Sequence, residues 1–145
     1  MAGGIRYSDD TGELDRARVH EWLSEHAYWA LGRPRAVQDA AIDGSWNYGA
    51  FDAGTGEQLG YARIVTDGVT FAWLCDVIVA PEARGGGVGV GLIGFVVERL
   101  EPLGLKRIAL ATGDAHDLYA RFGFEPLARP DQWMVRGANA VEPAP

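Results

Sequence analysis

The chain has 145 residues, with 13 Lys and Arg against 20 Asp and Glu, which gives a net charge of −7 at pH 7. This acidic balance argues against nucleic-acid binding. It mildly favours a cationic substrate such as an amine, and the alternative is that the charge only maintains solubility. Cys75 is the only cysteine, so an internal disulfide and a cysteine-based metal site are excluded. The sequence shows neither a signal-peptide pattern nor an apolar run of membrane-spanning length, so we expect a cytoplasmic protein without membrane or metal partners.

Length and composition predict one domain over residues 1–136 and a disordered tail over 137–145. The hydrophobic pattern predicts helices over residues 12–26, 34–44, 88–103 and 114–122. It predicts strands over residues 5–7, 46–51, 59–66, 70–79, 107–112, 125–128 and 132–136. Two helices, an antiparallel meander and then a strand–helix–strand crossover predict an α/β fold with a sheet of mixed direction.

A glycine-dense loop joins the strand at 70–79 to the helix that follows it. Residues 84–89 read Arg-Gly-Gly-Gly-Val-Gly, and apolar residues then recur at helical spacing. Glycine lets a ligand approach the main chain, and the first N–H groups of a helix have no partner within it. Since the helix dipole adds positive potential at the same place, we expect the loop to bind a pyrophosphate.

Three phosphate-binding motifs compete for this loop. A Walker motif is excluded because no Lys follows the glycines. The dinucleotide fingerprint matches Gly89, Gly91 and Gly94, but these glycines lie inside the expected helix, and the next strand lacks the acid that the fingerprint requires. The third pattern, Arg/Gln-x-x-Gly-x-Gly/Ala, is met by Arg84, Gly85, Gly86, Gly87, Val88 and Gly89. At these residues the chain resembles the GNAT superfamily of acyl-CoA-dependent N-acetyltransferases, which carry this pattern as their pyrophosphate-binding signature.

The resemblance covers about residues 5–136. It implies a GNAT fold, in which a mixed, mostly antiparallel central sheet is splayed in the middle and flanked by about four helices. It also implies acetyl-CoA as the co-substrate, held by residues 84–89 and by the exposed backbone of Val77 and Val79 where the central strand splays from the next.

A second motif supports the resemblance. Leu118-Tyr119, followed by the turn Gly123-Phe124, resembles the GNAT segment that flanks the pantetheine arm. The resemblance places the Tyr119 hydroxyl at the thioester sulfur, where a phenol can protonate the departing thiolate as a general acid. A Tyr that only shapes the tunnel is the alternative. Asp114, at the start of the segment, and Thr112, where an Asn is common in the family, are assigned to cofactor binding.

Asp76 is an acid in an otherwise apolar strand. Strict alternation places its side chain on one face with Leu74 and Ile78. Because a buried carboxylate costs several kcal/mol unless it is paired, its presence requires a reason. Two interpretations stay open: Asp76 orients the acceptor amine or relays its proton, or it bonds to backbone N–H groups and holds the splay open.

The resemblance places the acceptor pocket between the loop joining the first two helices and the ends of the middle strands. Most of the residues assigned to it are aromatic: His26, Tyr28, Trp29, Trp46, Tyr48 and Trp73. Aromatic walls suit an organic amine, and they also suit core packing. His26 is either a candidate base or a polar cap at the helix end. Arg33 and Arg35 are either solvated or hold an acidic group of the substrate. Cys75 is expected to be a buried apolar residue rather than a nucleophile.

Two functions remain open at this point. The first is transfer of an acetyl group from acetyl-CoA to a primary amine of a small molecule or peptide, by direct attack in a ternary complex. Tyr119 would be the acid, Asp76 or water the base, and a backbone N–H of the central strand would polarise the carbonyl. The second is a non-catalytic acyl-CoA sensor, suggested by the absence of a Glu or His base beside Cys75. A homodimer through the last strands is also considered.

Overall fold

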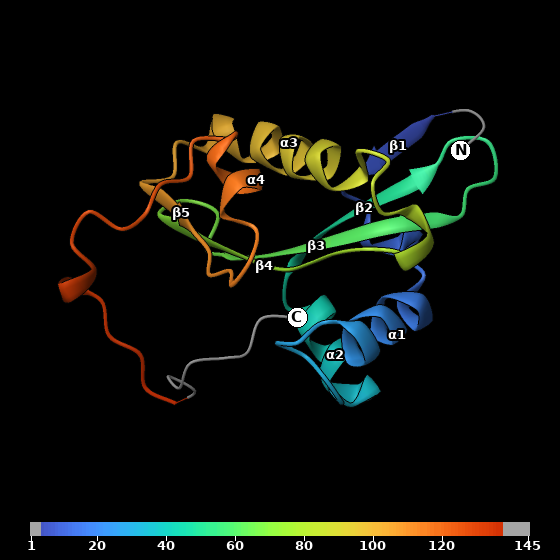
Figure 1. Cartoon of the computed structure of the whole chain (residues 1–145), viewed down its shortest axis with the longest axis horizontal. Helices are drawn as coiled ribbons and strands as arrows, with labels where there is room; N and C mark the ends of the chain where they lie inside the picture. The colour runs from blue at the N-terminus through green and yellow to red at the C-terminus, as the bar shows by residue number, and fades with distance from the viewer. Residues whose placement is uncertain (1–3, 138–145) are drawn as a thin grey trace.

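The computed structural model describes residues 4–137, which form a five-stranded sheet with helices on both faces (Figure 1). The strands are β1 (Ile5–Ser8), β2 (Trp46–Asp52), β3 (Gln58–Thr66), β4 (Phe71–Val79) and β5 (Arg107–Ala109). The helices are α1 (Arg16–His26), α2 (Arg35–Asp43), α3 (Val88–Leu100) and α4 (His116–Ala120). The sheet order is β1-β2-β3-β4-β5, antiparallel throughout except between β4 and β5.

These elements confirm the predicted α/β class, with a mixed, mostly antiparallel sheet and four helices. None of the helices between residues 4 and 137 is long and apolar enough to cross a membrane. Over the same residues, no three His, Cys, Asp or Glu side chains gather where they could hold a metal ion. Residues 138–145 of the predicted tail lie outside the part of the chain that the structure describes.

One apolar core lies on each face of the sheet. Val88, Leu92 and Val96 recur one turn apart on α3 and are buried against the sheet. On the opposite face, Leu23 of α1 and Ile42 of α2 are fully buried. Each such side chain contributes about 1.5–3 kcal/mol on burial. The two cores therefore fix α3 above the sheet and α1 and α2 below it in the view of Figure 1.

The first helix begins later than the sequence pattern predicts. The Asp10 side chain accepts the Gly12 N–H at 2.8 Å, but it caps only a short 3-10 turn. A second acid, Asp15, then caps α1 by accepting the Arg18 N–H at 3.1 Å. Two acids that can each cap a helix lie close together here. The sequence pattern predicts that the helix starts after the first of them, whereas it starts after the second.

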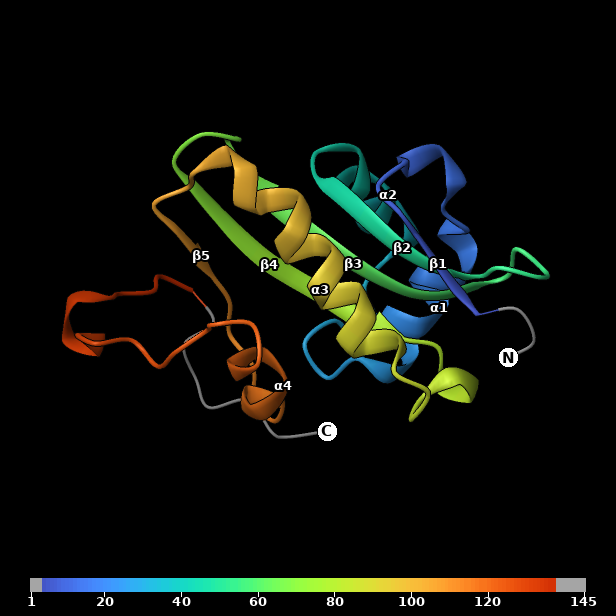
Figure 2. The same ribbon diagram turned by 90° about the horizontal axis from the view of Figure 1, so that it is seen from above.

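β4 and β5 diverge soon after they meet. Their ladder consists of three pairs, which end at Trp73 and Ala109, although β4 continues to Val79. Figure 2 shows β5 and the segment after it turning away from β4 toward α4. The splay implied by the GNAT resemblance is therefore present, and the edge of β4 beyond Trp73 has no ladder partner in β5.

The prediction of a final strand pair is wrong. After α4, the regular structure in the described residues is one 3-10 turn, Pro130–Gln132, and the segment extends away from the sheet (Figure 1). Proline has no N–H to donate to a ladder, so Pro126 and Pro130 interrupt strand pairing. Arg129 and Asp131 form an exposed ion pair beside this turn, at 2.8 Å.

Candidate active site

β4 carries a bulge at Asp76. Around this residue the pairing advances by two residues on β3 and by three on β4, and Asp76 has a φ of +52°. A bulge leaves the extra residue unpaired and shifts the alternation of side chains. Leu74 accordingly lies in the core between the sheet and α3, whereas Ile78 lies in the core between the sheet and α1. The prediction that these residues share one face is wrong, because strict alternation does not allow for an inserted residue.

Three side-chain donors surround the Asp76 carboxylate. Its Oδ1 accepts from Trp29 Nε1 at 2.9 Å, and its Oδ2 accepts from an Arg33 guanidinium nitrogen at 2.7 Å and from Arg63 Nε at 2.9 Å. The Asp76 side chain is only 1% exposed. Burial alone would raise the pKa of Asp76, but the two guanidinium groups outweigh it and hold the pKa below its ordinary value. Asp76 is therefore ionised and paired at neutral pH, with side chains rather than backbone N–H groups as its donors.

Removing this charge is expected to destabilise the fold. Asp76→Asn should lower the free energy of unfolding at neutral pH by about 3 kcal/mol, because two arginines would remain without their counter-ion. The folded pKa lies below the unfolded one, so the stabilisation is present above the unfolded value and is lost as the pH falls through the folded value. The gap between wild type and variant should therefore hold down to about pH 5 and shrink below about pH 4. Urea unfolding across this range measures it.

Asp131→Asn is the matched control for that experiment. It also removes a carboxylate from an arginine pair, but both partners are more than half exposed, so stability should be nearly unchanged. An Asp76→Asn protein that unfolds at the same urea concentration as wild type would show that the buried network contributes nothing to the fold.

A cavity of about 460 Å³ lies in the splay between β4 and the loop leading into α4. Its lining includes predicted residues of all three kinds, catalytic, cofactor-binding and acceptor-binding: Asp76, Tyr119, Val77, Thr112, Asp114, Tyr28, Trp29 and Trp73. The volume is within the range of small-molecule sites. The α1–α2 connection supplies two of these residues, so the cavity is built from segments far apart in the sequence.

Several predicted acceptor residues lie elsewhere. Tyr48 is buried beneath α3, its ring centroid 6.2 Å from that of Phe95. Trp46 packs over Gly68 at the β3–β4 turn, and His26 is exposed at the end of α1. Arg35 forms an ion pair with Asp39 on the surface of α2, at 3.1 Å. The structure does not bring these side chains into the lining of the cavity.

Two titratable side chains of the cavity stay neutral at physiological pH. Burial raises the pKa of Tyr119 to about 12, with a further contribution from the nearby Asp114 charge. Burial likewise raises the pKa of the Cys75 thiol to about 11. Tyr119 is therefore a hydrogen-bond donor at any physiological pH, and Cys75 is a poor nucleophile.

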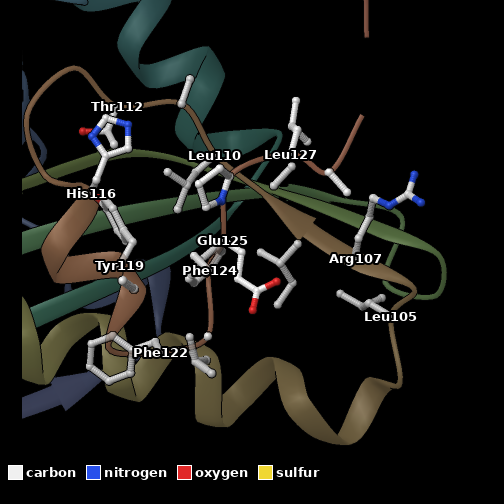
Figure 3. Close-up of a pocket in the computed structure, with 18 of the residues that line it drawn as sticks. Leu105, Arg107, Leu110, Thr112, His116, Tyr119, Phe122, Phe124, Glu125 and Leu127 are labelled. Atoms are coloured by element: carbon white, nitrogen blue, oxygen red, sulfur yellow. The ribbon is translucent and has the colours of Figure 1, made fainter. Parts of the chain in front are cut away.

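The Tyr119 ring also lines a larger cavity, of about 1070 Å³, on the far side of the loop that leads into α4. Figure 3 shows Tyr119 and His116 reaching into it from α4, with Arg107 and Leu105 on the opposite side. The C-terminal segment forms another part of its wall, where the Trp133 ring centroid lies 5.8 Å from the Arg107 guanidinium carbon. The Tyr119 side chain therefore lies in the wall between the two cavities.

Thr112 shapes the turn before α4. Its hydroxyl accepts the Ala115 N–H at 3.1 Å and the Asp114 N–H at 3.4 Å. These bonds join residues two and three positions apart, so they fix the turn that leads into α4. Thr112 thus has a structural role whether or not it also contacts a cofactor.

The glycine loop is open in the way a pyrophosphate requires. Residues 84–87 are exposed, and Gly85 and Gly87 have φ values of +83° and +82°. A Cβ built at either position would meet nothing within 4 Å, so no side chain in the described residues blocks the bend. Gly87 caps α3 without a side chain, which leaves the first N–H groups of a 13-residue helix free to bind an anion. These residues fit the diphosphate of coenzyme A.

Comparison with known proteins gives one family. A family model described as the acetyltransferase (GNAT) family matches residues 11–124. A crystal structure from Xanthomonas campestris pv. campestris, described as an acetyltransferase of the GNAT family, is 41% identical and has a TM-score of 0.87, covering 93% of this chain and 94% of that one. A Mycobacterium tuberculosis protein solved with CoA and NLQ has a TM-score of 0.68 at 18% identity, over 86% of this chain and 72% of that one, which shows a shared fold.

A curated acetyltransferase of Gibberella zeae is 41% identical over 66 residues, which is 45% of this chain. The match spans only 37% of that relative's own length. The family match, by contrast, includes the bulged strand, the open glycine loop and the helix that carries Tyr119. The segments that build the cavity are thus the ones the family model recognises, and the chain belongs to the GNAT family of acetyltransferases and is an acyltransferase.

Proposed function

We propose that the protein transfers the acetyl group of acetyl-CoA to a primary amine of a small molecule or peptide while both substrates are bound. The observation that carries this proposal is the arrangement along β4. The cavity opens beside the unpaired edge of this strand, and the glycine loop follows the strand's end. A long cofactor can therefore extend along one strand, with its diphosphate on the loop and its thioester beside Tyr119.

The backbone of β4 has two roles in this proposal. The free edge at Val77 and Val79 pairs with the pantetheine amides as an added strand would. Bound acetyl-CoA supplies an activated thioester carbonyl. The bulge at Asp76 leaves ladder groups unpaired, and we assign to one of these N–H groups the polarisation of that carbonyl. Arg84, Gly85, Gly86, Gly87, Val88 and Gly89 hold the diphosphate, with Thr112 and Asp114 on the opposite wall.

Tyr119 stabilises the departing sulfur as a hydrogen-bond donor. With a pKa of about 12, its phenol is a weaker acid than a thiol of pKa about 8.5. Complete proton transfer from the phenol would be uphill by roughly 3.5 pKa units, or about 5 kcal/mol. The hydroxyl therefore donates a hydrogen bond to the developing thiolate, and solvent supplies the final proton.

Water, rather than a side chain, takes the proton from the acceptor amine in this mechanism. Asp76 is ionised but paired with two arginines, so it holds the wall of the site instead of acting as a strong base. Trp29 and Trp73, which are 39% and 36% exposed, flank the approach to the cavity. Their faces suit an amine carried on an apolar or aromatic group.

The pH dependence of the reaction should report the amine alone. An alkylamine has a pKa of about 10.4, so kcat/KM should rise about tenfold for each pH unit between roughly pH 6 and 8. Initial rates at low amine concentration measure this slope, with the acetyl-CoA affinity at each pH as the control. A slope that flattens within this range would instead indicate a side-chain base and would contradict a water-mediated deprotonation.

The proposal is tested by measuring thiol release from acetyl-CoA with a panel of arylalkylamines, polyamines and peptides. Release that depends on one of these amines, with a matching mass gain of the acceptor, supports it. Tight acetyl-CoA binding without release from any amine would contradict it and favour the sensor function.

A further inference from the structure

The α1–α2 connection, residues 27–34, contacts both walls of the cavity. On one side, Trp29 and Arg33 donate hydrogen bonds to Asp76 at the β4 bulge, at 2.9 and 2.7 Å. On the other side, the Tyr28 hydroxyl oxygen accepts the Gly113 N–H at 2.8 Å. The β4–β5 ladder has already ended at this level. The connection therefore joins two walls that the sheet itself leaves apart.

The side chains of this strap, residues 27–34, support one another. The rings of Tyr28 and Trp29 meet edge to face, with centroids 5.0 Å apart and planes at 88°. The Trp29 ring is in turn fixed by the bond from its indole N–H to Asp76. The fit at the far end is close, since a Cβ at position 113 would lie 3.0 Å from the Tyr28 oxygen. A continuous chain of contacts thus runs from Gly113 through both rings to the buried carboxylate.

We propose that Tyr28 is a positioning residue that sets the width of the cavity and thereby limits the donor to a short acyl group. This inference rests on the proposed function, in which the cavity receives the acyl end of the donor. Tyr28 acts by holding the loop that leads into α4 at a fixed distance from the β4 bulge. Because the Tyr28 oxygen accepts the Gly113 N–H, its own proton is free to be donated into the cavity.

Tyr28→Phe tests the strap by removing one oxygen and keeping the edge-to-face contact of the ring with Trp29. In the ligand-free protein, hydrogen exchange at the Gly113 amide, followed by NMR, should become about tenfold faster. Calorimetric titration without amine should show the affinity ratio of butyryl-CoA to acetyl-CoA rising about three- to tenfold. Tyr7→Phe, which removes a phenol oxygen on the α3 side of the sheet, should change neither quantity.

Gly113→Ala is a second, independent probe. Its methyl group would press on the Tyr28 oxygen and should shift the affinity ratio in the same direction. If both changes act through one contact, the double variant should show no further shift beyond the larger single effect. If Tyr28→Phe folds poorly, Gly113→Ala alone still tests the contact through the same affinity ratio.

The outcomes separate the strap from the proposed function. Unchanged Gly113 exchange in Tyr28→Phe would overturn the strap, and lost protection with an unaltered affinity ratio would overturn its role in donor choice. Wild-type protein that binds neither thioester would overturn the proposed function itself. The exchange rate of Gly113 would still decide, in that case, whether Tyr28 joins the two walls.

Discussion

Gly87→Asp is expected to weaken acetyl-CoA binding about a thousandfold, the loss of two or three charge-assisted hydrogen bonds. Gly87 is the cap residue of α3 and has a φ of +82°. A Cβ built on it would face open space. A carboxylate at a helix cap accepts the first N–H groups of the helix, so it would compete with the diphosphate for the same donors. It would also place a negative charge where the cofactor carries its own. Calorimetric titration with acetyl-CoA measures the loss.

Gly104→Asp is the matched control for this experiment. Gly104 ends a 3-10 turn at the other end of α3, with a φ of +65° and equally open surroundings. Both substitutions impose a left-handed conformation on a residue with a Cβ, which costs about 1–2 kcal/mol. The two variants should therefore lose similar stability, while only Gly87→Asp loses the cofactor. Acetyl-CoA affinity within tenfold of wild type in Gly87→Asp would refute the assignment of the loop.

Tyr119→Phe should lower kcat about a hundredfold and leave the acetyl-CoA dissociation constant nearly unchanged. The ring would still fill its place between the two cavities and against Phe124, 5.8 Å away between centroids. Only the donor to the developing thiolate would be lost. Since that donor is proposed to act in the transition state alone, kcat and kcat/KM should fall together. Steady-state kinetics with a responsive amine measure both constants.

Tyr48→Phe controls for the loss of a buried phenol oxygen. Tyr48 is also buried, and its pKa is also raised to about 12, but its ring lies in the core beneath α3 and outside the lining of the smaller cavity. Its removal should leave kcat unchanged. Full activity of Tyr119→Phe would remove Tyr119 from the mechanism and return it to the tunnel-shaping alternative.

The open geometry of the glycine loop could be predicted because it depends on local sequence. A helix start, a left-handed cap and the absence of side chains are all properties of consecutive residues, so residues 84–89 specify an exposed bend at a helix N-terminus by themselves. The strand and helix pattern on either side is equally local. The structure confirms the order of the first five strands and the four helices for that reason.

The bulge at Asp76 could not be predicted. Nothing in the sequence of β4 shows that the paired segment of β3 has one residue fewer. The bulge turns Asp76 toward Arg63, a partner that the sequence reading missed. A register drawn outward from the Asp67-Gly68 turn would have placed an arginine of β3 near this carboxylate, and that was the available signal. The prediction of the last two strands was wrong for a different reason. Pro126 and Pro130 have no N–H to donate to a ladder, and a hydrophobic pattern does not reveal this loss.

The buried Asp76 carboxylate and its three side-chain donors fix one aromatic residue at the cavity and leave another free to vary. Trp29 lines the cavity and also donates a hydrogen bond to the buried Asp76 carboxylate, so exchanging it to admit a new acceptor would also disturb the folded state. Trp73 lines the same cavity without being one of those donors. Under the proposed function, we therefore expect new acceptor preferences to be acquired most easily through changes at Trp73.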